Sequence, residues 1–165
     1  MNDDGATRPD PRTEEAARAA ACLIGQWGEG WNAHDIGALA GLVTADVAFV
    51  NVAGKRLLGR EEFREHHQAI HRAQLCDSTW RTLGWEWCHL PGAQLLTHVE
   101  WMIRGERDAT SLPRAPRSGV FTWLLISTKA GCRIRAAHNT DMRAGIYHRT
   151  EGGLRARLEL EGGCP

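Results

Sequence analysis

The segment from residue 49 to residue 72 restricts the fold most strongly, because it predicts a strand, a turn, a short return strand and a helix in direct succession. Gly54 lies in the turn, where glycine adopts backbone torsions that other residues avoid. Two glutamates follow soon after, and acidic side chains favour the positive end of a helix dipole. The segment therefore predicts a β-hairpin followed by a helix over residues 60–73.

Three histidines lie on or beside the apolar stripe of this helix. His67 shares the stripe with Phe63 at a spacing of four residues, and His66 and His71 flank it. A neutral imidazole near a bound carbonyl or enol can move a proton at physiological pH, because its ordinary pKa lies close to that pH. We therefore expect this helix to line a cavity.

The N-terminal part predicts two helices after a polar arm. Residues 1–12 are polar and lack periodicity, so we expect a disordered arm there. Thr13 can cap the first helix, and its apolar stripe runs from Ala16 to Trp31 at spacings of three and four residues. Asp35 can cap a short helix over residues 36–43.

Four later segments alternate in polarity or stay apolar over the length of a long strand: 78–89, 94–104, 119–128 and 132–140. Trp85 and Trp101 lie on the faces that we expect to point inward, and His138 shares its face with Ile134 and Ala136. With the helices, these strands predict an α+β fold in which one curved, mainly antiparallel sheet wraps around the helices. We expect this domain to span residues 13–144, with a C-terminal tail at 145–165.

Composition narrows the function classes. The formal net charge is zero, so a nucleic-acid footprint is not expected, and no apolar run of membrane length occurs. Five cysteines form no CxxC pair and no signal peptide is present, which predicts reduced thiols in a cytoplasmic protein. No glycine-rich motif follows a strand, so no cofactor is expected.

Metal binding is an alternative use of two of these histidines. His67 and His71 are four residues apart, which lets two imidazoles on a helix share one metal. A third ligand could come from His138, His98 or a cysteine. No HExxH motif occurs, and a catalytic zinc needs three convergent ligands, so we expect no metal site.

Two stretches, WNAHDIGALAGLVTADVAFVNVAGKRLLGREEFREHHQAIH (31–71) and RIRAAHNT (133–140), resemble the SnoaL-like branch of the nuclear transport factor 2-like superfamily. More narrowly, the chain is similar to small proteins of actinobacterial antibiotic clusters, including those of enediyne biosynthesis. The resemblance implies a cone-shaped α+β fold with an internal cavity and a homodimer packed through the outer sheet face. Family members include polyketide cyclases, isomerases, dehydratases, epoxide hydrolases and cavity proteins with no known reaction.

One family feature is not matched. In the SnoaL-like cyclases an aspartate acts as general base, whereas the late strands here offer His98, Glu100 and His138 and no inward aspartate. For the dimer, we expect apolar residues on the outer sheet face: Leu96, Met102, Phe121, Trp123 and Leu125.

These observations predict a cofactor-independent cyclase, isomerase or lyase that acts on an apolar, polyketide-like intermediate. The expected acid/base groups are His67, His71 and His138. The expected pocket residues are Trp31, Asn51, Trp85 and Trp101. We expect His67 and His138 to face one internal hollow bounded by two of these tryptophans. The alternative is a non-catalytic protein that binds a small molecule for a partner polyketide synthase.

Overall fold

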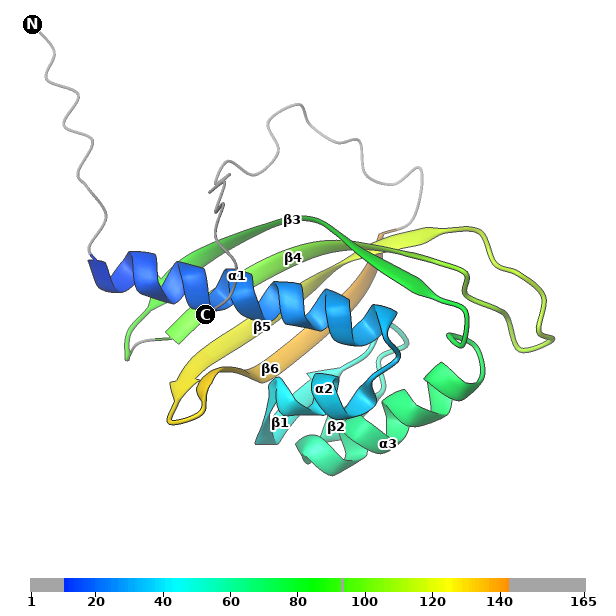
Figure 1. Ribbon diagram of the computed structural model, residues 1–165, viewed down its shortest axis with the longest axis horizontal. Coiled ribbons are helices and arrows are strands. Elements are labelled where there is room, and N and C mark those ends of the chain that lie inside the picture. The colour runs from blue at the N-terminus through cyan, green and yellow to red at the C-terminus, as the bar shows by residue number, and fades with distance from the viewer. Residues whose placement is uncertain (1–10, 93, 143–165) are drawn as a thin grey trace, which may run out of the picture.

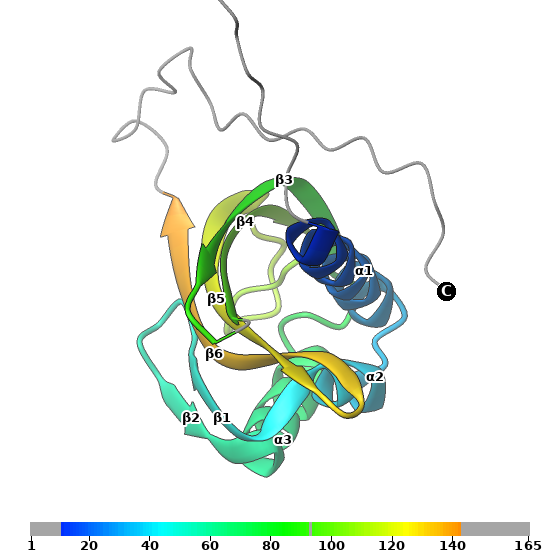
Figure 2. The same ribbon diagram turned by 90° about the vertical axis from the view of Figure 1, so that its left-hand side faces the viewer.

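The computed structural model describes residues 11–92 and 94–142, which form a curved six-stranded sheet wrapped around helices (Figures 1 and 2). In chain order the elements are α1 (Pro11–Asn32), α2 (Ile36–Gly41), β1 (Val43–Val50), β2 (Arg56–Leu58), α3 (Gly59–Arg72), β3 (Thr79–Leu90), β4 (Gln94–Arg104), β5 (Arg117–Thr128) and β6 (Gly131–Met142). The predicted C-terminal tail lies outside the described residues, as does the arm up to residue 10.

The strands follow the order β2-β1-β6-β5-β4-β3, and every neighbouring pair is antiparallel except β1 and β6. Helix α1 lies along the concave side of the sheet and contacts β3, while α3 packs against β1 and β2 (Figure 2). The predicted α+β architecture, a curved sheet around helices, is confirmed.

The helices differ from prediction only at their ends. Helix α1 begins at Pro11, before Thr13, because proline is well tolerated in the first helical turn. Asp35 caps α2 as predicted, since its Oδ1 accepts a hydrogen bond of 2.8 Å from the Ala38 N–H. Helix α2 ends at Gly41 because Val43 already starts β1.

A β-bulge in β6 reverses the predicted facing of its second half. The register of β5 and β6 shifts between the pairs Leu124–Ala136 and Leu125–Ile134, so Arg135 is the extra residue. Beyond the bulge, Ala137 is buried inside, whereas His138 pairs with Thr122 on the outer face and is exposed. The prediction that His138 faces inward with Ile134 is therefore wrong.

A second irregularity lies in β3. Its register against β4 shifts between Thr82 and Gly84, which leaves Leu83 42% exposed. As a result Trp80 and Trp85, which are an odd number of residues apart, both pack against the core.

The facing of β5 also differs from prediction. Phe121, Trp123 and Leu125 are buried in the core and do not contribute to the outer face. Both faces of this strand are apolar, so alternation could not show which face is inside; the face with the large aromatic side chains is the buried one.

Aromatic rings fill the concave side of the sheet. Trp27 of α1 is fully buried, and its indole lies 5.2–6.4 Å, between ring centroids, from Trp31, Phe63, His67, Trp80, Phe121 and Trp123. Edge-to-face and tilted packing of this kind adds to the free energy of apolar burial.

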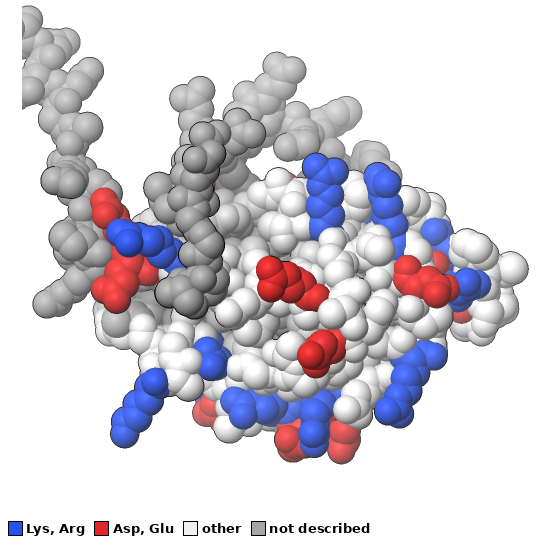
Figure 3. Space-filling model, in the orientation of Figure 1, with Lys and Arg blue, Asp and Glu red and all other residues white. Residues whose placement is uncertain are grey.

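Two further features concern the chain as a whole. Among the described cysteines, Cys76, Cys88 and Cys132 are free thiols. Within the described part of the chain, no helix has the length and apolarity needed to cross a bilayer. On the face in Figure 3, acidic and basic side chains are interspersed.

The central position of Trp27 generates a stability prediction. Trp27→Ala should lower the free energy of unfolding by about 3–5 kcal/mol, because a fully buried indole is replaced by a cavity. Urea denaturation monitored by circular dichroism measures the change, with Trp87→Ala at a half-buried position as the control. A loss below about 1 kcal/mol for Trp27→Ala would show that the ring cluster does not stabilise the fold.

Candidate functional site

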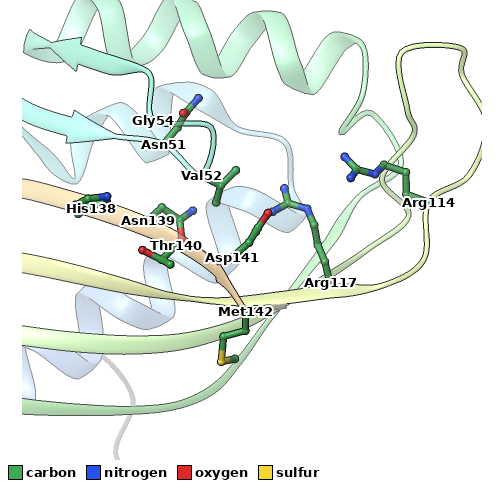
Figure 4. Close-up of a pocket in the computed structure, with 10 residues that line it drawn as sticks. All are labelled: Asn51, Val52, Gly54, Arg114, Arg117, His138, Asn139, Thr140, Asp141 and Met142. Atoms are coloured by element: carbon green, nitrogen blue, oxygen red, sulfur yellow. The ribbon is translucent and has the colours of Figure 1, made fainter. Parts of the chain in front are cut away.

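A pocket of about 500 Å³ lies where the β1–β2 turn, the start of β5 and the end of β6 meet (Figure 4). We call it the rim pocket. Its lining residues are Asn51, Val52, Gly54, Arg114, Arg117, His138, Asn139, Thr140, Asp141 and Met142. Two residues predicted from the sequence, Asn51 and His138, thus belong to one pocket.

Charged side chains form a network at this pocket. Arg117 donates through Nε to Glu106 and through Nη1 to Asp141, and Arg114 Nη1 lies 3.2 Å from the other oxygen of Glu106. The Glu106 side chain is only 8% exposed and that of Arg117 19%. Two guanidinium groups therefore balance two carboxylates, one of which is almost completely buried.

The ring of Trp101 packs against the Arg117 guanidinium group of this network. The Arg117 guanidinium carbon lies 5.3 Å from the centre of the Trp101 ring, within the range of a cation–π contact. The Trp101 Nε1–H donates to Asn139 Oδ1 at 2.8 Å, which fixes the indole in its plane. The ring passes directly over Gly119, where a Cβ atom would collide with it. Glycine at 119 is thus required for this arrangement.

Asn51 occupies the turn between β1 and β2, where Gly54 has φ +78° as predicted. The Asn51 Oδ1 accepts hydrogen bonds from the backbone N–H groups of Ala53 and Lys55, so its amide nitrogen must face the other way and donate to His66 Nε2 at 3.2 Å. Burial, and then the nearby Lys55, lower the pKa of His66.

His67 is a core residue in this structure. Its ring is 3% exposed, stacks on Phe63 at 4.0 Å, and donates from Nδ1 to the Phe63 carbonyl oxygen at 2.8 Å. Burial lowers the pKa of His67 to about 3, although the hydrogen bond to Phe63 opposes this shift. The imidazole is therefore neutral at physiological pH.

His71 forms a separate pair with His34. Their Nδ1 atoms are 2.8 Å apart, so one ring donates and the other accepts, and the two cannot both carry a proton on Nδ1. Burial, and then the proximity of His34, lower the pKa of His71 to about 4. Among the described residues its Nε2 has no hydrogen-bond partner.

The structure does not bring His67 and His138 into one hollow. His67 is packed among Phe63, Phe49 and Trp27, whereas His138 lies on the outer side of β6 at the rim pocket. The prediction of a shared environment is therefore wrong, because the bulge at Arg135 turns His138 away from the helices.

The predicted tryptophans occupy different places. Trp31 is buried against His71 and donates from Nε1 to Ser78 Oγ at 3.1 Å. Trp85 is half-buried against the core, and Trp101 lies beneath Arg117. Of the four predicted pocket residues, only Asn51 lines the rim pocket directly among the described residues.

Sequence reasoning missed Asp141, Arg117 and Glu106. Asp141 shares the inner face with Asn139 because of the bulge, so an aspartate does reach the pocket from the last strand. Arg117 lies before the strand predicted over residues 119–128, but in the structure it starts β5. The charged residues around the prolines at 113 and 116 could have indicated this part of the site: Glu106, Arg114 and Arg117.

No group of three or more histidine, cysteine, aspartate or glutamate side chains that could hold a metal occurs in residues 11–92 and 94–142. Although His67 and His71 are four residues apart, they do not form a metal-binding group with a third such side chain within this part of the chain.

The two lowered histidine pKa values predict a loss of stability in acid. An unfolded chain takes up a proton on each imidazole below pH 6.5, whereas the folded chain resists until about pH 4 at His71 and about pH 3 at His67. With respect to these two histidines, the free energy of unfolding is therefore highest above pH 6.5 and decreases as the pH falls below that value. Between pH 6.5 and 5 each histidine should cost about 2 kcal/mol.

Urea denaturation across this pH range measures the effect. His67→Gln should remove about half of the pH dependence, and His89→Gln, at an exposed position, should leave it unchanged. A free energy of unfolding that is constant from pH 7 to 5 contradicts buried neutral imidazoles.

No family model matches the sequence, and no curated protein is significantly similar to it. Solved structures do resemble the fold. A nuclear transport factor 2-like superfamily protein from Salmonella enterica superposes with a TM-score of 0.70 at 14% identity, covering 81% of this chain and 96% of that one. A hexachlorocyclohexane dehydrochlorinase, LinA type 2, gives 0.73 at 11% identity, covering 87% and 99%. An uncharacterised protein with a cystatin-like fold from Caulobacter vibrioides gives 0.73 at 20% identity, covering 79% and 92%. The chain therefore has the nuclear transport factor 2-like, or cystatin-like, fold.

Proposed function

We propose that this protein is a cofactor-independent enzyme that moves a proton on a small carbonyl compound bound in the rim pocket. The observation that carries the proposal is the carboxylate of Asp141, fixed by Arg117 in the wall of a pocket of about 500 Å³. A positioned carboxylate beside hydrogen-bond donors is the arrangement that general acid–base catalysis requires.

The residues of the rim pocket take different roles in this proposal. Asp141 removes a proton from carbon, and His138, which lines the same pocket, is the second titratable group. Asn51 and Asn139 orient the substrate at the wall of the pocket. The proposal leaves out His67 and His71, because both are buried and held in hydrogen bonds away from this pocket.

The reaction class stays that of a cyclase, isomerase or lyase. One protein of the same fold is, by its name, a dehydrochlorinase, which is a lyase. A polyketide-like substrate, a role in natural-product biosynthesis and a synthase partner rest on the resemblance to SnoaL-like proteins of antibiotic clusters. A cytoplasmic location rests likewise on the sequence. Two arginines in the lining indicate that the substrate, although largely apolar, carries a polar oxygen.

A homodimer through the outer sheet face is also part of the proposal. That face carries half-buried apolar side chains on two neighbouring strands: Leu96, Met102, Val120, Leu124 and Ile126. An apolar sheet face of this kind supports a self-complementary interface.

The alternative is a protein that binds a small molecule without chemistry. It is favoured by the ion pairs, since arginines already engage both Asp141 and Glu106 when no substrate is bound. Binding without turnover is then the expected behaviour.

Deuterium exchange separates the two functions. In D2O, the wild-type protein should accelerate exchange of the α-protons of 2-tetralone, an apolar ketone, as followed by proton NMR. Asp141→Asn should reduce the catalysed rate by about 100-fold or more, because the base is lost. Asp46→Asn, which changes an aspartate paired with Arg135 outside the rim pocket, is the matched control. Undiminished exchange in Asp141→Asn would exclude this residue as the base, and binding without exchange would favour the alternative.

A further inference from the structure

We propose that Arg117 binds the oxygen of the substrate that becomes negatively charged, and that the buried Glu106 is a positioning residue that holds Arg117 for this purpose. The substrate class is then a carbonyl compound that passes through an enolate. The catalytic part of this inference rests on the proposed function, whereas the anion-binding part does not.

Arg117 has hydrogen-bond donors left for a ligand. A guanidinium carries five N–H groups. Glu106 accepts from Nε and Asp141 from Nη1, and no described residue accepts from Nη2. Because Arg117 lines the rim pocket, as its side chain does in Figure 4, these free N–H groups are available to a ligand there.

The guanidinium group of Arg117 is held rigidly. Glu106 fixes one edge of the guanidinium, and the ring of Trp101 fixes its face at 5.3 Å. Trp101 is itself held by Asn139 and by its close approach to Gly119. Donors that need no rearrangement stabilise developing charge more strongly than mobile ones.

The burial of Glu106 supports its positioning role. A carboxylate whose side chain is 8% exposed is costly to desolvate, and a surface arginine alone gives little in return. Glu106 is bound by Arg117 and, at 3.2 Å, by Arg114, so it locks two arginines that both line the pocket. A role in orienting these cations explains a carboxylate at this position.

The charges around Arg117 match the charge that develops during the reaction. Arg114, Arg117, Glu106 and Asp141 together carry no net charge. When Asp141 takes the proton, the C–H bond breaks and its electron pair moves to the carbonyl oxygen as an enolate. The four residues then carry one positive charge, which matches the enolate oxygen at Arg117 Nη2.

Binding of a stable anion tests the inference independently of turnover. The probe is 2-naphthoate, and the neutral reference of the same shape is 2-naphthamide, both measured by isothermal titration calorimetry. The wild type should bind the carboxylate about tenfold or more tightly than the amide. Arg117→Met should abolish this preference without changing amide binding, so amide binding also reports that the variant is folded. Arg117→Lys keeps the charge but loses the planar fork, and should retain only part of the preference.

The two carboxylates should respond in opposite directions. Asp141→Asn should tighten naphthoate binding, because it removes a negative charge from the pocket. Glu106→Gln removes a charge as well, but it should weaken naphthoate binding because Arg117 loses its orientation. Arg135→Met, outside the pocket, is the control and should change neither affinity.

Several results would overturn the inference: no binding of either probe, equal affinity of the wild type for the two, or a preference that survives in Arg117→Met. Tighter naphthoate binding in Glu106→Gln would refute the positioning role. Failure of α-proton exchange together with a confirmed anion preference would instead refute only the proposed reaction.

Discussion

The packing of aromatic rings around Trp27 organises the interior of this fold. This indole lies on α1 and contacts rings from α3, β3 and β5, so it joins the helices to the concave face of the sheet. With Phe63, Trp101, Phe121 and Trp123 also buried at 0–1% exposure, the interior of the cone is filled by side chains. A histidine placed there, such as His67, becomes a neutral core residue. The charged groups capable of chemistry therefore gather at the rim, where the ends of β5 and β6 meet water.

The bulge in β6 and the glycine at position 119 decide which side chains reach that rim. The extra residue in β6 turns Asn139 and Asp141 inward and His138 outward. Gly119 then leaves space for the ring of Trp101, which carries Arg117 on its face and donates to Asn139. The position of Arg117 at the rim pocket thus depends on the ring of Trp101, which in turn depends on Gly119 and on the facing of Asn139. A bulge next to a candidate site is common in β-sheets, because it redirects a side chain without disturbing the rest of the strand.

Hydrophobic periodicity predicted the elements of the fold well, since α3 and the four long strands depend on patterns that repeat over ten or more residues. It could not predict the bulges at Leu83 and Arg135, because a single extra residue leaves no mark in the alternation. The same limit explains which residues of the candidate site could be predicted from the sequence. Asn51 could be predicted because it follows Phe49 on the same strand face, whereas Asp141 was missed because its facing depends on the bulge. Arg117 and Glu106 form an ion pair because β5 already starts at Arg117. The prolines and arginines before this strand do not indicate where it begins.

Small molecules should bind at the rim, above Trp101, and not among the rings around Trp27. Nuclear magnetic resonance of protein labelled with 15N at the tryptophan indoles tests it most directly, with 2-naphthoate as the ligand and Trp101→Phe to assign the Trp101 signal. The Trp101 Nε1–H, which donates to Asn139, should shift and reach saturation as naphthoate is added. The signals of the buried Trp27 and Trp123 indoles should not shift. Shifts at Trp27 and Trp123 with an unchanged Trp101 signal would place the ligand in the interior and contradict the account.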